Sequence, residues 1–92
     1  MYAVIFSQRA DKDIISIVKH VAAEHPEAAK KLGSNLLDVA LSLDSMPYRG
    51  SKVKMRRDVL KLIHQKYLIY YRVNERNKTV EVLRFLHGAR IK

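Results

Sequence analysis

Residues 67–73 read YLIYYRV and residues 79–90 read TVEVLRFLHGAR, with a short polar turn between them. Both runs are rich in β-branched and aromatic residues, which predicts two strands, at approximately Tyr67 to Val73 and Thr79 to Leu86. A similar run predicts a strand just before them, at approximately Arg57 to Ile63. Because the connections are short, these three strands are expected to form an antiparallel meander.

The residues before this meander predict one more strand and two helices. Tyr2 to Phe6 is a short β-rich run, and Ser7 is predicted to be the N-cap of a helix that begins near Arg9. Pro26 is tolerated in the first turn of a helix and therefore marks the start of a second one. Apolar residues recur at helical spacing in both segments, so both helices are expected to be amphipathic.

The resulting order is β-α-α-β-β-β, which predicts an α+β fold. Two amphipathic helices need one face of a sheet to cover, so we expect a two-layer sandwich with an antiparallel sheet and a helical hairpin on one face. In the second helix, Leu37 and Leu41 widen the apolar stripe beyond what one neighbour should cover. These two leucines are therefore expected to contact a partner.

The chain has 92 residues, which predicts a single domain, 1–92, with one modest core. It has no cysteine, which excludes a disulfide scaffold and a thiolate metal site and agrees with a cytoplasmic location. No apolar run approaches the roughly 20 residues that span a bilayer, and no signal peptide is recognisable, so no membrane association is expected.

The basic charge is concentrated in the second half of the chain. Residues 49–92 contain 13 Lys and Arg against 3 Asp and Glu, a net charge of +10, while residues 1–48 have a net charge of −1. Five of the nine positions from 49 to 57 are basic and none is acidic. This asymmetry favours a surface that binds a polyanion or an acidic partner over an ordinary solvated loop.

Strand alternation predicts which side chains lie on the sheet face that the helices leave uncovered. Leu68, Tyr70 and Arg72 should share that face in one strand, opposite Ile69, Tyr71 and Val73. In the next strand, Val82, Arg84 and Leu86 should share it, opposite Leu83 and Phe85. The predicted target-binding or nucleic-acid-binding residues are Lys52, Lys54, Arg56, Arg57, Arg72, Arg84 and Arg90. The alternative is that these are solvated surface residues.

His87 is the histidine with the most suggestive context, because Arg84 and Arg90 are close to it in sequence. We expect it just beyond the last strand, held by a loop over the same face. An imidazole there could transfer a proton while Lys61 and the two arginines stabilise a phosphorane, which makes these four residues a candidate catalytic set. The alternative is a histidine bonded to backbone at a strand end. No HExxH motif, carboxylate cluster in the basic half or glycine-rich phosphate loop is present, so no metal or cofactor is predicted.

An ordered set of motifs resembles the RelE/ParE toxin superfamily. It comprises Ser7, Ala10, Asp13 and Ile14, then PEAA at 26–29, MPYRG at 46–50, YLIYYRV at 67–73 and HGAR at 87–90. The resemblance implies the toxin of a bacterial type II toxin–antitoxin pair of the plasmid-stabilisation type. Such a toxin arrests growth and is held inactive by a cognate antitoxin, which is expected here to cover Leu37 and Leu41.

The superfamily divides by target, and the resemblance is slightly closer to ParE. ParE-like members resemble inhibitors of DNA gyrase, whereas RelE-like members resemble endonucleases that cut messenger RNA on the ribosome. Leu68 occupies the position at which the ribonuclease members carry an arginine, and HGAR resembles the closing motif of ParE. The RelE-like enzyme is one alternative. A non-catalytic nucleic-acid-binding module is another, although no helix-turn-helix or RNP motif is recognisable.

Overall fold

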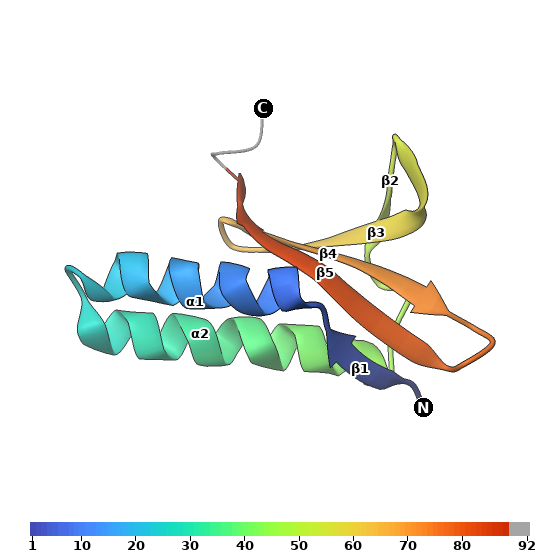
Figure 1. Cartoon of the computed structure of the whole chain (residues 1–92), viewed down its shortest axis with the longest axis horizontal. Helices are drawn as coiled ribbons and strands as arrows, with labels where there is room; N and C mark the ends of the chain where they lie inside the picture. The colour runs from blue at the N-terminus through green and yellow to red at the C-terminus, as the bar shows by residue number, and fades with distance from the viewer. Residues whose placement is uncertain (89–92) are drawn as a thin grey trace.

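The computed structural model describes residues 1–88 and contains two helices packed on one face of a twisted sheet (Figure 1). The helices are α1 (Gln8–Ala22) and α2 (Pro26–Leu41), followed by a 3-10 turn, η1 (Ser42–Asp44). The strands are β1 (Ala3–Phe6), β2 (Ser51–Val53), β3 (Arg56–His64), β4 (Tyr67–Asn74) and β5 (Thr79–His87). The predicted α+β class, with a helical hairpin on one sheet face, is confirmed.

The strand order across the sheet is β1-β5-β4-β3-β2, which differs from the predicted sheet in two details. Strand β1 pairs with β5 in parallel, so the sheet is mixed and not wholly antiparallel. Strand β2, which pairs with β3, was not predicted. Strand β2 has only three residues, begins at Ser51 and comes directly after Gly50. Glycine and serine are typical of connections, so the sequence gives no sign of a strand there. The last three strands form the predicted meander.

Both helices begin where the sequence indicates. The side chain of Ser7 accepts a hydrogen bond from the backbone N–H of Ala10 at 3.0 Å, which is the predicted N-cap of α1. Pro26 occupies the first turn of α2. The core lies between these helices and the sheet, and its fully buried members include Leu36, Ile69 and Phe85.

A bulge in β5 changes which of its side chains face the helices. Tyr70 lies opposite Arg84, but the next residue of β4, Tyr71, lies opposite Val82, so Leu83 is an extra residue in β5. Consequently Val82 and Phe85 are both buried against the helices. The prediction that Val82 faces outward and Leu83 inward was therefore wrong. In β4 the predicted alternation is confirmed, because Ile69 and Tyr71 are buried.

Gly50 and Gly33 are close to neighbouring atoms for different reasons. A Cβ on Gly50 would lie 2.5 Å from the carbonyl oxygen of Lys61 and 2.7 Å from the hydroxyl of Tyr71, which also accepts the Gly50 N–H. A Cβ on Gly33, inside α2, would lie 3.0 Å from Cγ2 of Val18 on α1. This contact shows that α1 and α2 cross closely at Gly33.

Gly50→Ala is expected to lower the free energy of unfolding by about 1–3 kcal/mol, because backbone atoms of β3 would have to move. Gly33→Ala is the matched control. Its added methyl meets only the end of the Val18 side chain, and alanine gains about 1 kcal/mol of helix propensity, so little net change is expected. Urea denaturation of both variants measures the difference. Equal stability of the two would contradict the described approach of Gly50 to β3.

Glu75, in the turn between β4 and β5, accepts hydrogen bonds from three side chains. The ammonium of Lys78 lies 2.9 Å from its carboxylate, the hydroxyl of Tyr2 lies 2.7 Å away, and the hydroxyl of Tyr48 also donates to it. The bonds from Lys78, Tyr48 and Tyr2 lower the pKa of Glu75 to about 2. The same carboxylate raises the pKa of Tyr48 to about 12. These contacts join the residue just before β1, the loop before β2 and the β4–β5 turn.

Glu75→Gln is expected to reduce the loss of stability in acid. The pKa of Glu75 in the folded protein lies below its ordinary value of 4.5, so its contribution is complete above about pH 4.5 and disappears as the pH falls toward about 2. Denaturant midpoints measured across this interval should fall less steeply in the variant. Glu27→Gln is the control, because that carboxylate is 91% exposed and its ion pair with Lys30 is a surface one, so the acid curve should change little. Parallel curves for the wild type and Glu75→Gln would refute the prediction.

Candidate functional site

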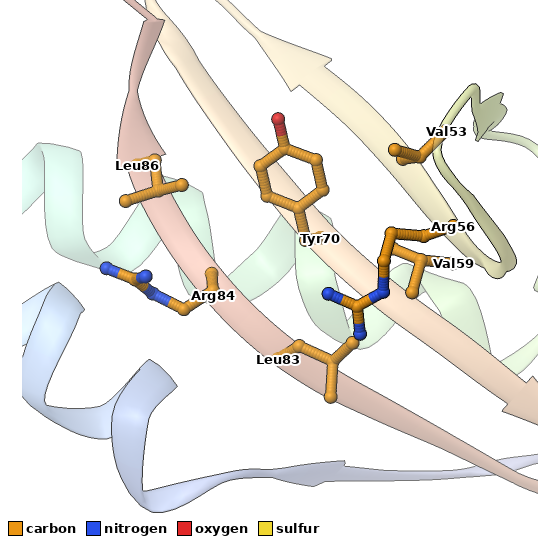
Figure 2. Close-up of a pocket in the computed structure, with 7 residues that line it drawn as sticks. All are labelled: Val53, Arg56, Val59, Tyr70, Leu83, Arg84 and Leu86. Carbon is orange, nitrogen blue, oxygen red and sulfur yellow. The ribbon is translucent and has the colours of Figure 1, made fainter. Parts of the chain in front are cut away.

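The open face of the sheet contains a groove of about 380 Å³. Its lining residues come from β2, β3, β4 and β5, and they are Val53, Arg56, Val59, Tyr70, Leu83, Arg84 and Leu86. Figure 2 shows the Tyr70 ring between Arg84 and Leu86 on one side and Arg56, Val59 and Val53 on the other. We call these seven residues the open-face groove. Most of its lining is aliphatic, which the charge pattern alone did not predict.

Pairing across the strands aligns three polar side chains on this face. Lys61 of β3 lies opposite Tyr70 of β4, and Tyr70 lies opposite Arg84 of β5. Directly opposed residues of an antiparallel pair project from the same face, so the three form one row. The β2–β3 hairpin adds Arg56 at the other side of the groove, opposite Val53. Lys61 and Arg84 were both predicted, and the row places them beside Tyr70.

Arg84 is bound to helix α1 and does not project freely from the sheet. Its guanidinium donates to both carboxylate oxygens of Asp13, with the Nε bond at 2.7 Å and the Nη2 bond at 3.2 Å. The hydrogen bond that Arg84 donates to Asp13 raises the pKa of Arg84. Strand β1 ends at Phe6, so α1 and not a strand lies beside this part of β5, and Asp13 also accepts the N–H of Phe85 at 3.1 Å. Arg84 was predicted to point away from the helices. This was wrong, because its guanidinium is bonded to Asp13 of α1.

Arg72 faces outward as predicted, but two carboxylates neutralise it. Its Nε lies 3.0 Å from Glu81 and its Nη1 lies 3.3 Å from Asp58. These bonds, first to Glu81 and then to Asp58, raise the pKa of Arg72. The sequence could not show this pairing, because Asp58 and Glu81 belong to the two strands on either side of β4. Arg72 therefore offers little net charge to a ligand.

The other predicted basic residues lie on or near the β2–β3 hairpin. Lys52, Lys54, Arg56 and Arg57 are exposed, and within residues 1–88 no Asp or Glu carboxylate lies within 4.0 Å of them or of Lys61. Only Arg56 lines the open-face groove. Lys52 lies opposite Leu60, which packs against the core, so the register directs it to the helix side of the sheet. The four residues therefore do not form one patch.

His87 is the last residue of β5 and does not lie on a loop beyond it. Its ring packs edge-on against Tyr67, with ring centroids 5.1 Å apart. Tyr67 is a buried core residue, and both side chains line a small cavity with Ser16, Ile17 and His20 of α1. The imidazole thus lies toward the helix layer, away from Lys61. Arg90, the fourth member of the predicted catalytic set, lies outside the described residues.

The outer face of the helical hairpin has an exposed apolar surface. Leu37 is 39% exposed and Leu41 is 47% exposed, in agreement with the expected surplus in the α2 stripe. Ile15 of α1, which the sequence analysis did not single out, is 55% exposed. A hollow of about 260 Å³ between the helices is lined by Ile15 and Leu37, among others. Among the described residues, no cluster of His, Asp or Glu is arranged to hold a metal, and no helix is long and apolar enough to cross a membrane.

Comparisons with known proteins agree with this fold. The family model described as "ParE toxin of type II toxin-antitoxin system, parDE" matches residues 4–92. A solved structure of the chromosomal ParDE system from P. aeruginosa is similar, with a TM-score of 0.82 and 20% identity over 95% of this chain and 96% of that chain. The RelBE2 toxin–antitoxin complex of Mycobacterium tuberculosis gives a TM-score of 0.75 and 21% identity over 94% and 96% of the two chains.

The isolated E. coli RelE toxin is also similar, with a TM-score of 0.64 and 20% identity over 100% of this chain and 89% of that chain. No curated protein sequence matches the chain. At these identities the solved structures establish the shared fold, while the family model covers nearly the whole sequence.

Proposed function

This chain belongs to the ParE toxin family of type II toxin–antitoxin systems, and from that premise we propose that it arrests bacterial growth by inhibiting DNA gyrase. It acts in the cytoplasm as a single toxin domain, residues 1–92, and a cognate antitoxin holds it inactive. Solved relatives of the same fold are themselves toxin–antitoxin complexes, which supports an antitoxin as partner. The apolar surface at Leu37 and Leu41 is the antitoxin's proposed contact.

We propose gyrase and not messenger RNA as the target because the candidate catalytic groups lie apart from one another. General acid–base cleavage of RNA needs a proton-transferring group and cations around one reacting phosphate. Here Lys61 lies on the open face, the guanidinium of Arg84 is bound to Asp13, and His87 packs on Tyr67 toward the helices. Leu68, at the position where ribonuclease members carry an arginine, adds no further cation. This arrangement supports a toxin that binds its target without cutting RNA.

Two experiments test the proposal. One expresses the protein in bacteria without its antitoxin, and the other measures the supercoiling activity of purified gyrase in its presence. We expect growth arrest with DNA damage while translation continues, and loss of DNA supercoiling by gyrase in vitro. The antitoxin encoded beside the gene, when co-expressed, should prevent both effects. Prompt loss of protein synthesis, with cuts mapped inside ribosome-bound messages, would overturn the gyrase proposal in favour of the ribonuclease.

His87→Gln separates the same two activities in a single variant. A gyrase inhibitor moves no proton at His87, so inhibition should weaken by less than about tenfold. A ribonuclease that used this imidazole would lose about 10²–10⁴-fold in cleavage rate. Supercoiling and messenger-RNA cleavage assays on the same preparation measure both quantities. A loss of about 10²–10⁴-fold in the rate of messenger-RNA cleavage would assign a catalytic role to His87.

A further inference from the structure

We propose that the open-face groove receives one apolar side chain from an acidic segment of gyrase, with the flanking carboxylates of that segment bound by Arg56 and Lys61. This inference rests on the proposed function, because it names the chemistry by which the target is recognised. The groove is the site through which the toxin contacts gyrase, and it is separate from the helical surface assigned to the antitoxin.

The groove has the composition of a pocket for an apolar side chain. Val53 and Val59 line one side, and Leu83 and Leu86 line the other, with the Tyr70 ring between them (Figure 2). Val59 is only 3% exposed although it lies on the sheet face without helices, so the neighbouring side chains already shield it from water. An aliphatic or aromatic side chain placed here would bury further apolar area without leaving polar groups unpaired.

Few cations at the groove are available to a ligand. Arg84 is compensated by Asp13, and Arg72 is compensated by Glu81 and Asp58. Arg56 and Lys61 remain without an Asp or Glu partner among residues 1–88. In Figure 2 the Arg56 side chain extends over β4 toward Leu83, while the Arg84 guanidinium is turned away toward α1. Two available cations beside an apolar hollow suit one or two carboxylates next to an apolar anchor.

A nucleic acid strand fits this surface less well. A strand presents one phosphate per nucleotide and is bound along a continuous track of cations. The row Lys61, Tyr70 and Arg84 offers one available cation, because Arg84 is occupied by Asp13. A phosphate held over Leu83 and Leu86 would lose water without gaining a donor. A peptide needs no such track, since its apolar side chain supplies most of the contact.

Binding of short peptides to the full chain tests this chemistry directly. The probe is a peptide with one phenylalanine between glutamates. The matched peptides replace the phenylalanine by alanine, or the glutamates by glutamines. We expect the probe to shift nuclear magnetic resonances of the open-face groove, and each matched peptide to bind at least about tenfold more weakly. Equal binding of all three peptides, or tighter binding of a single-stranded RNA oligonucleotide that shifts the same resonances, would overturn the proposal.

Variants then connect the groove to gyrase. Arg56→Glu and Leu86→Glu should each reduce gyrase inhibition at least tenfold and still form the complex with antitoxin, which shows that they fold. Arg76→Glu, in the exposed β4–β5 turn, and Ile63→Glu, 62% exposed on β3, are the matched controls and should inhibit fully. If the wild type inhibits gyrase and the groove variants do so equally, the groove is not the contact and the proposed function survives. If the wild type does not inhibit gyrase, the function is wrong, and the peptide measurements still decide whether the groove binds an acidic apolar segment.

Discussion

Replacing Asp13 by alanine is expected to destabilise the protein by about 2–4 kcal/mol. The Asp13 carboxylate accepts two bonds from Arg84 and one from the Phe85 backbone N–H, and its side chain is only 12% exposed. Hydrogen bonds to charged groups contribute about 1.5–3 kcal/mol, and a donor left without a partner adds a desolvation cost. The whole fold is stabilised by only about 5–15 kcal/mol, so this loss is large. Thermal unfolding should show a fall in melting temperature of at least about 8 °C.

Two further substitutions make this result specific to the carboxylate. Asp11→Ala removes an exposed acid from the first turn of the same helix and should change stability by less than about 1 kcal/mol. Arg84→Ala should cost less than Asp13→Ala, because Asp13 would still accept the N–H of Phe85. An Asp13→Ala variant as stable as Asp11→Ala would show that the three bonds contribute nothing net.

The double substitution Leu37→Glu and Leu41→Glu is expected to weaken antitoxin binding at least about 100-fold. Both side chains are partly exposed on α2 in the free toxin, and burying apolar anchors of this size typically dominates a helix-in-groove interface. In the variant, binding of an apolar partner surface would remove water from the two introduced glutamate carboxylates, which opposes binding. Titration calorimetry with the purified antitoxin measures the change, and co-expressed antitoxin should no longer prevent growth arrest.

Ile5→Glu is the matched control for this pair. Ile5 is 48% exposed on β1, so it has similar exposure and receives the same new charge away from the helical surface. It should leave antitoxin affinity within about threefold of the wild type. If the double variant binds as tightly as the control, the antitoxin covers a different surface of the toxin.

Local signals in the sequence were sufficient for both helices, for strands β1, β3, β4 and β5, and for the two layers, but not for β2. The Ser7 cap, Pro26 and the apolar spacing of both helices are properties of a few neighbouring residues, and the structure has each of them where the sequence indicates. The same is true of the alternation in β4. Wherever one turn or one strand contains its own determinants, sequence reasoning gave the observed structure.

The site was less predictable because its geometry depends on distant residues. The bulge at Leu83 contains no glycine and has no local sequence signature, yet it moves Val82 into the core and Leu83 into the open-face groove. Asp13 and Arg84 are 71 residues apart, so the sequence around either residue does not indicate that the two side chains pair. The basic excess predicted a functional surface, but carboxylates on neighbouring elements decide which cations are available to a ligand.

The position of β5 also affects when the chain can fold during its synthesis. This strand is the last of the described strands along the chain, yet it lies between β1 and β4 and contributes Val80, Val82 and Phe85 to the core. Until Thr79–His87 has left the ribosome, β1 has no partner and the helices have an incomplete sheet to cover. Native contacts between such distant segments form slowly. The sheet and the core can therefore be completed only after Thr79–His87 has been synthesised, although the helices and β1 are made much earlier.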